Sequence, residues 1–170
     1  MHVPLRLIGP AIRGLVLRKG KSGPTTTVPV KHQSRFNWTY KREKNEFARL
    51  YDLAKRSQWN ASEQLDWSIN VDPHNPNIDL VPEEWTPLPD IRAYRLLPKK
   101  TQQVHRKQLL TWMLSQFLHG EQGALFAACQ VTEAIQEVDG KLFGSTQVVD
   151  EGRHVEVFTR YLTEKMEKLY

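Results

Sequence analysis

The chain has 170 residues, of which 39% are hydrophobic and 25% are charged, a balance typical of one globular domain with its own core. No apolar run approaches the roughly 18 residues that a transmembrane helix needs. The single cysteine, Cys129, excludes an internal disulfide framework and a multi-cysteine zinc cluster, and it favours a reducing, cytoplasmic location.

The net charge of +5 is unevenly distributed along the chain. Residues 1–42 contain nine Lys or Arg and no acid, so the remaining residues carry 15 basic and 19 acidic groups. A nucleic-acid-binding domain is expected to place its positive charge on a folded face. We therefore expect neither a nucleic acid nor a membrane among the partners of this protein.

Residues 1–37 are predicted to form a basic, loosely structured arm. Proline and glycine recur in "IGPAIRGLVLRKGKSGPTTTVPV", and this spacing argues against a long helix. A segment that is rich in arginine and free of acids is also typical of a transit peptide. A third interpretation is the edge of a sequence whose true start lies elsewhere; all three stay open, and the sequence favours the arm.

Residues 38–98 are predicted to form one helix followed by a proline-rich connection packed on the bundle. The stretch "YKREKNEFARLYDLAKRSQW", residues 40–59, spaces its apolar residues as a helix does. Its acids come early and its bases late, as the helix dipole favours. Six prolines lie between Pro73 and Pro98, and they prevent a second long helix there.

Residues 99–170 are predicted to form a long antiparallel helix hairpin. No proline follows Pro98, and the first helix is expected over about residues 100–136. "DG" at 139–140 is a turn signal, after which the second helix runs to the last residue. The expected fold class is therefore all-α.

The second predicted helix carries Glu151 and His154 three residues apart, so both project from one face. Glu121 lies in the first helix among apolar neighbours, where a carboxylate without a partner is costly. The midpoint of residues 121 and 151 is 136, which places both carboxylates about 22 Å from the turn at similar height. The spacing therefore predicts a metal site made by Glu121, Glu151 and His154, with no catalytic residue beyond these ligands.

"GEQGALFAACQ" and "STQVVDEGRHVEVFTRYL" resemble the first helix hairpin of the ferritin-like di-iron carboxylate proteins. This superfamily includes monooxygenase hydroxylases and ribonucleotide reductase small subunits. The resemblance covers about residues 105–162 and is most specific at "DE-x-RH". It implies a ferritin-like helical bundle, of which this chain forms the first hairpin, or half bundle, behind an irregular N-terminal arm.

The resemblance also implies roles for individual residues. Glu121, Glu151 and His154 would bind one half of a pair of iron ions, or an Fe/Mn pair, whose mixed oxygen and nitrogen ligands suit these metals. Asp150 would orient a metal-bound histidine, and Arg153 would be an ion-pair partner outside the ligand shell. Gln147 stands one turn before Glu151 and is a further candidate neighbour of the site.

The implied function is that of a non-haem di-iron or Fe/Mn oxidoreductase, such as a monooxygenase, which activates O2 and acts on a small organic substrate. A complete site of this type uses a Glu from each of two helices and a Glu-x-x-His pair from each of two others, and this chain holds half of that set. The missing C-terminal half of the same protein, or a second identical chain related by a twofold axis, would supply the rest. The alternative is a metal-free helical interaction or scaffold protein that completes its bundle with a partner.

Overall fold

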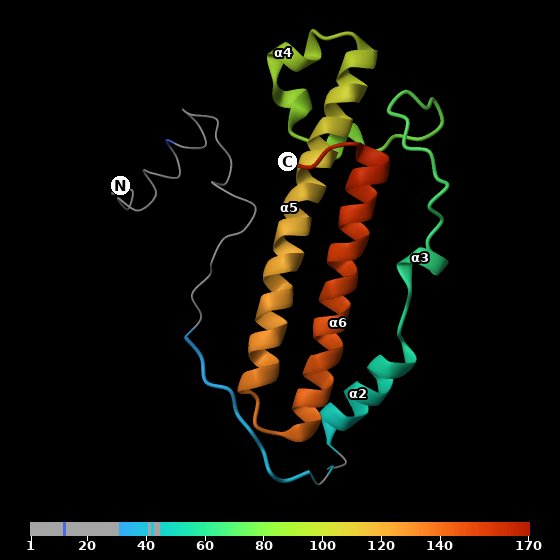
Figure 1. The fold of residues 1–170 in the computed structure, drawn as a ribbon. Helices are drawn as coiled ribbons and strands as arrows, with labels where there is room; N and C mark the ends of the chain where they lie inside the picture. Colours follow the sequence, from blue (N-terminus) through green and yellow to red (C-terminus); the bar gives the residue numbers. More distant parts are fainter. Residues whose placement is uncertain (1–11, 13–30, 41, 43–44) are drawn as a thin grey trace. The chain divides into compact units, whose positions relative to one another are not determined.

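The computed structural model describes residues 12, 31–40, 42 and 45–170. The chain divides into two compact units, Met1–Lys31 and His32–Tyr170, and the second unit is described below. Most of the predicted arm over residues 1–37 lies outside the described residues. The regular elements within the described ranges are all helices (Figure 1), which confirms the all-α prediction. None of these helices is both long and apolar enough to cross a membrane.

Two long antiparallel helices, α5 (Lys99–Ala134) and α6 (Val138–Tyr161), form the centre of this unit (Figure 1). Residues 135–137 connect them, so the predicted turn at residues 139–140 is wrong. Asp139 and Gly140 instead lie in the first turn of α6, where the helix dipole favours a carboxylate. Asp139 accepts a hydrogen bond from Arg42. Gly140 leaves the space that the side chain of Ile135 occupies, so this glycine serves packing.

Contacts on both sides of the connection hold the two helices together. The Nζ of Lys141 donates to the carbonyl oxygens of Thr132, at 3.2 Å, and Glu133, at 3.1 Å, and so satisfies the end of α5. A Cβ at Gly144 would lie 2.6 Å from the Thr132 Oγ1 and 3.4 Å from its Cα. The helices therefore approach closely where Gly144 faces Thr132.

The C-terminal end of the hairpin differs from the predicted continuous helix. A π-helical turn, η5 (Leu162–Met166), follows α6 and buries Leu162 and Met166 beside Val71 and Leu118. Glu167 then adopts a left-handed φ of 60°, and the backbone N–H of Tyr170 donates to the Oγ of Ser115 at 3.2 Å. The prediction that the second helix runs to the last residue is wrong because the chain turns back onto α5.

The helix α2 (Glu46–Arg56) packs against α6, on the side away from α5 (Figure 1). It is shorter than the predicted helix over residues 40–59, of which residues 41, 43 and 44 are outside the described part. Asn45 caps its start, because the Asn45 Oδ1 accepts the N–H of Ala48 at 2.9 Å. Its last turn closes at Ser57, whose N–H donates to the Leu53 carbonyl at 3.0 Å.

The connection from α2 to α5 contains short helical pieces between irregular stretches: α3 (Ala61–Gln64), η3 (Glu83–Trp85), η4 (Leu88–Asp90) and α4 (Arg92–Arg95). Before α2, residues within 32–40 hydrogen-bond to the connected end of the hairpin. The Arg35 N–H donates to the Glu133 carbonyl at 2.8 Å, and the Asn37 side chain donates to the Gln136 carbonyl at 2.9 Å. A hydrogen bond with the His32 ring lowers the pKa of Glu133.

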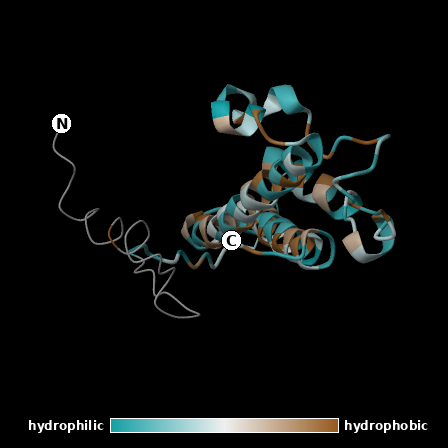
Figure 2. Cartoon of the chain, turned by 90° about the horizontal axis from the view of Figure 1, so that it is seen from above, coloured by the Kyte–Doolittle hydropathy of each residue, from teal (hydrophilic) through white to brown (hydrophobic). Residues whose placement is uncertain are grey.

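Hydrophobic residues are spread around the long helices and do not form one stripe (Figure 2). Several large apolar side chains of α5 are therefore exposed, including Trp112 at 48%, Phe117 at 52% and Phe126 at 48%. Where exposed apolar residues form a contiguous patch, that patch often marks a surface that a partner covers.

The burial of Leu162, which is 1% exposed, generates a prediction for stability. We expect Leu162→Ala to lower the free energy of unfolding by about 3 kcal/mol, because truncation leaves a cavity in the small core. Leu169→Ala is the control, since Leu169 is 55% exposed, and its effect should stay within about 0.5 kcal/mol. Urea denaturation measures both, and equal effects would contradict this description of the core.

The close approach at Gly144 generates a second prediction. Gly144→Leu should lower the free energy of unfolding by about 1–3 kcal/mol, because the new side chain meets Thr132 across the hairpin. Gly152→Leu is the matched control on the same helix, where a Cβ has open space, and it should raise stability by about 0.5–1 kcal/mol through helix propensity. If both variants were equally stable, α5 and α6 would not pack as described.

Candidate metal site

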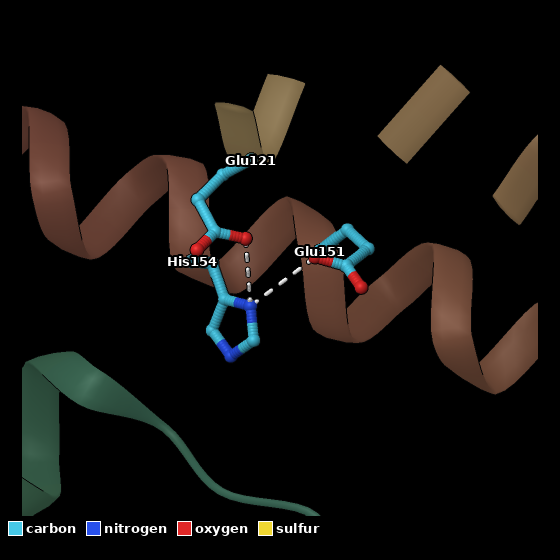
Figure 3. Close-up of side chains that lie close together, drawn as sticks. All are labelled: Glu121, Glu151 and His154. Atoms are coloured by element: carbon cyan, nitrogen blue, oxygen red, sulfur yellow. Dashed lines mark hydrogen bonds and ion pairs between the residues drawn. The ribbon is translucent and has the colours of Figure 1, made fainter. Parts of the chain in front are cut away.

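The three predicted ligands come together midway along the hairpin (Figure 3). One ligand atom from each of Glu121, Glu151 and His154 lies within 4.8 Å of the other two. The Nδ1 of His154 is 3.2 Å from the Glu121 Oε2 and 3.3 Å from the Glu151 Oε2. Glu121 comes from α5, whereas Glu151 and His154 come from adjacent turns of α6.

The register of the hairpin explains this meeting and differs slightly from the predicted one. Thr132 faces Gly144, and the ring of Phe117 lies 6.3 Å from the ring of Phe158. Between these two contacts the register brings Glu121 opposite His154, while Glu151 lies one helical turn nearer the connection (Figure 3). The predicted equal height of the two carboxylates is therefore wrong by about one turn. The predicted neighbourhood of the three side chains is correct.

The cluster is partly exposed, so an ion from solution can reach it. The side chains of Glu121, Glu151 and His154 are 25%, 22% and 38% exposed. Ionised carboxylates only accept hydrogen bonds, so the Nδ1 of His154 carries the proton when it pairs with them. Two carboxylate oxygens and one imidazole nitrogen are a donor set that binds Fe(II), Mn(II) or a similar divalent cation.

Asp150 and Arg153 form a second group of contacts on α6, directed toward the segment after α2. Their side chains pair with each other at 3.3 Å. The Oδ1 of Asp150 also accepts the indole N–H of Trp59 at 3.2 Å, and Arg153 donates to the side chain of Gln58. The guanidinium carbon of Arg153 lies 5.6 Å from the centre of the Trp59 ring. Both predicted residues therefore lie next to the cluster without being in it.

Gln147 does not join the site in this structure. Its side chain is exposed, and within the described residues it makes no hydrogen bond to the three ligands. An amide one turn before Glu151 shares the ligand face of α6 by helical spacing. Helical spacing predicts only the face on which the backbone of Gln147 lies. In the structure this residue is exposed to solvent.

Sequence reasoning missed the contact of Trp59 with this site. The Trp59 ring lies 6.2 Å from the His154 ring, at an interplanar angle of 33°. The two residues are far apart in the sequence, and no local pattern around "SQWNAS" indicates which helix the indole meets. A partly buried indole N–H needs an acceptor, but the sequence does not identify Asp150 as the acceptor for Trp59.

Comparisons with family models, with curated proteins and with solved structures give no significant match to this chain. The chemistry of the site is therefore inferred from its own residues and their geometry.

Proposed function

We propose that this protein supplies one half of the ligands of a di-iron or Fe/Mn centre in an O2-activating oxidoreductase. The observation that carries the proposal is the convergence of Glu121, Glu151 and His154 from two helices within 4.8 Å. Glu121 is separated from the other two in the sequence, so the cluster depends on the tertiary packing of α5 and α6. The Glu-x-x-His pair of α6 would not form this three-residue cluster without α5.

The charges of the cluster support a divalent cation. Two ionised carboxylates and a neutral imidazole carry a charge of −2, which one divalent ion neutralises. In the described arrangement, a proton on the His154 Nδ1 would face both carboxylates, whose oxygens lie 3.2 Å and 3.3 Å from that nitrogen. A metal ion would take the place of that proton, because imidazole binds metals through an unprotonated nitrogen.

Each residue of the cluster would have a distinct role in the proposed site. Glu121 and Glu151 would bind the metal and balance its charge, and His154 would bind through Nδ1. Asp150 and Arg153 pair with each other beside this group, and Asp150 also accepts the indole N–H of Trp59. The chemistry that such a metal pair supplies when bound is the reduction of O2, coupled to the oxidation of a small organic substrate.

A second half is needed because three protein ligands leave the coordination of two metal ions incomplete. The exposed Phe117, four residues before Glu121, places uncovered apolar surface beside the site. A second hairpin that packed there would cover this surface and bring further ligands. Its source would be either a C-terminal half of the same protein or a second identical chain.

A metal-free helical scaffold is the competing proposal, and the exposed apolar residues of α5 favour it specifically. Phe126 and Val131 are 48% and 59% exposed, and a partner helix could cover them without any metal. In that case the contacts of His154 with the two glutamates would be a polar network only. Metal content separates the two proposals directly.

Iron content is the first test of the proposed function. After anaerobic loading with Fe(II), we expect the purified chain to retain about one iron per chain, half of a two-iron site. Glu151→Ala should remove this iron because it deletes one of three ligands. Glu156→Ala is the matched control, since Glu156 is exposed on the same helix, and it should keep the iron. Elemental analysis of gel-filtration fractions provides the measurement.

The size of the iron-containing fraction identifies the source of the second half. Iron that elutes with a dimer would mean that two copies complete the site, and iron with a monomer would mean that the hairpin binds metal unaided. The absence of iron from all fractions of the wild-type chain would contradict the metal proposal and favour the scaffold. An equal loss of iron in Glu151→Ala and Glu156→Ala would do the same.

A further inference from the structure

Trp59 links the segment after α2 to the candidate metal site. Its indole N–H donates to the Asp150 Oδ1 at 3.2 Å, and its ring lies 6.2 Å from the ring of His154. Asp150 directly precedes Glu151 in α6. The Trp59 side chain therefore contacts Asp150 and His154, which lie on either side of the candidate ligand Glu151 in the sequence.

Arg153 contacts this indole and also pairs with Asp150 and Gln58 beside it. Arg153 lies over the Trp59 ring, with 5.6 Å between the guanidinium carbon and the ring centre. The same guanidinium pairs with Asp150 at 3.3 Å and donates to Gln58, the residue before Trp59. The Arg153 side chain is 16% exposed and that of Asp150 is 39% exposed, so this network is partly buried. Partial burial strengthens such contacts relative to those on an open surface.

We infer that Trp59 is a positioning residue for the metal site, which holds the His154 ring in the orientation that presents Nδ1 to Glu121 and Glu151. An imidazole can rotate about its last side-chain bond, and this torsion has a broad energy profile. The indole lies beside the imidazole, with 6.2 Å between the ring centres, and restricts that rotation, while Asp150 accepts the indole N–H. The inference rests on the proposed function, because the positioned atom is the one that would bind metal.

The physical consequence is an increase in metal affinity through preorganisation. A ligand that already points at its site loses less conformational freedom when the ion binds. The Trp59 ring would act through His154 and not through direct contact with an ion. Residues that orient metal ligands in this way typically change metal affinity by about 10–100-fold when they are replaced.

Co(II) is the probe for the test, because its visible absorption reports the geometry of its ligands. We expect Trp59→Phe, which removes the indole N–H, and Trp59→Leu, which also removes the aromatic ring, to weaken Co(II) binding by about 10-fold or more. Trp67→Phe is the matched control. The Trp67 indole is also half-buried, donates its N–H to the Ala61 carbonyl at 2.7 Å and lies under Arg160 at 4.0 Å.

The spectrum of bound Co(II) distinguishes positioning from a purely structural role. At saturating Co(II), we expect the absorption bands to shift in both Trp59 variants and to stay unchanged in Trp67→Phe. A residue that only stabilised the fold would lower the unfolding free energy without changing the spectrum of the bound ion. Unchanged affinity and an unchanged spectrum in both Trp59 variants would overturn the inference.

A measurement on the metal-free protein separates this inference from the proposed function. The ring current of Trp59 should shift the ring-proton NMR resonances of His154, and Trp59→Leu should move them whereas Trp67→Leu should not. If the resonances move but wild-type protein binds no Co(II), the ring contact exists and the proposed function fails, and the metal-positioning role fails with it. If wild-type protein binds Co(II) and the resonances do not move, the inference alone is wrong.

Discussion

The packing of α5 against α6 through a short connection determines which side chains of the two long helices meet. Residues 135–137 leave little freedom for one helix to slide past the other, and Lys141 ties the start of α6 to the last carbonyls of α5. Gly144 then allows the helices to approach at Thr132. Because a helix rises by a constant distance per residue, this register extends along the hairpin and brings Glu121 to His154.

The same register creates an electrostatic problem within the hairpin. Two carboxylates lie near one imidazole, and a Coulomb repulsion between like charges is only partly screened at a half-exposed position. A proton on the His154 Nδ1 would relieve this repulsion, because the Nδ1 lies 3.2 Å from a Glu121 oxygen and 3.3 Å from a Glu151 oxygen. A divalent cation bound between these side chains, as in the proposed function, would also reduce this repulsion.

The helix α2 contributes to this region although none of its own residues enters the cluster. It packs on α6 on the side away from α5, and the chain just beyond it delivers Gln58 and Trp59 to Arg153 and Asp150. The candidate site therefore has contacts from α5 on one side and from the α2 segment on another. The remaining exposed apolar surface near Phe117 is where a further hairpin would complete the proposed centre.

The sequence by itself determined the all-helical class, the two long proline-free helices and the Glu-x-x-His pair, because these depend on local periodicity and on residue types that end helices. It also singled out Glu121, since a carboxylate among apolar neighbours needs a partner. Only the tertiary structure decided the remaining features. Asp139 and Gly140 begin a helix where a turn was predicted, because Arg42 and Ile135 pack against them. The end of the hairpin turns back onto Ser115, and Trp59 reaches Asp150 across 91 residues of sequence, because such contacts depend on how distant segments pack and leave no local pattern.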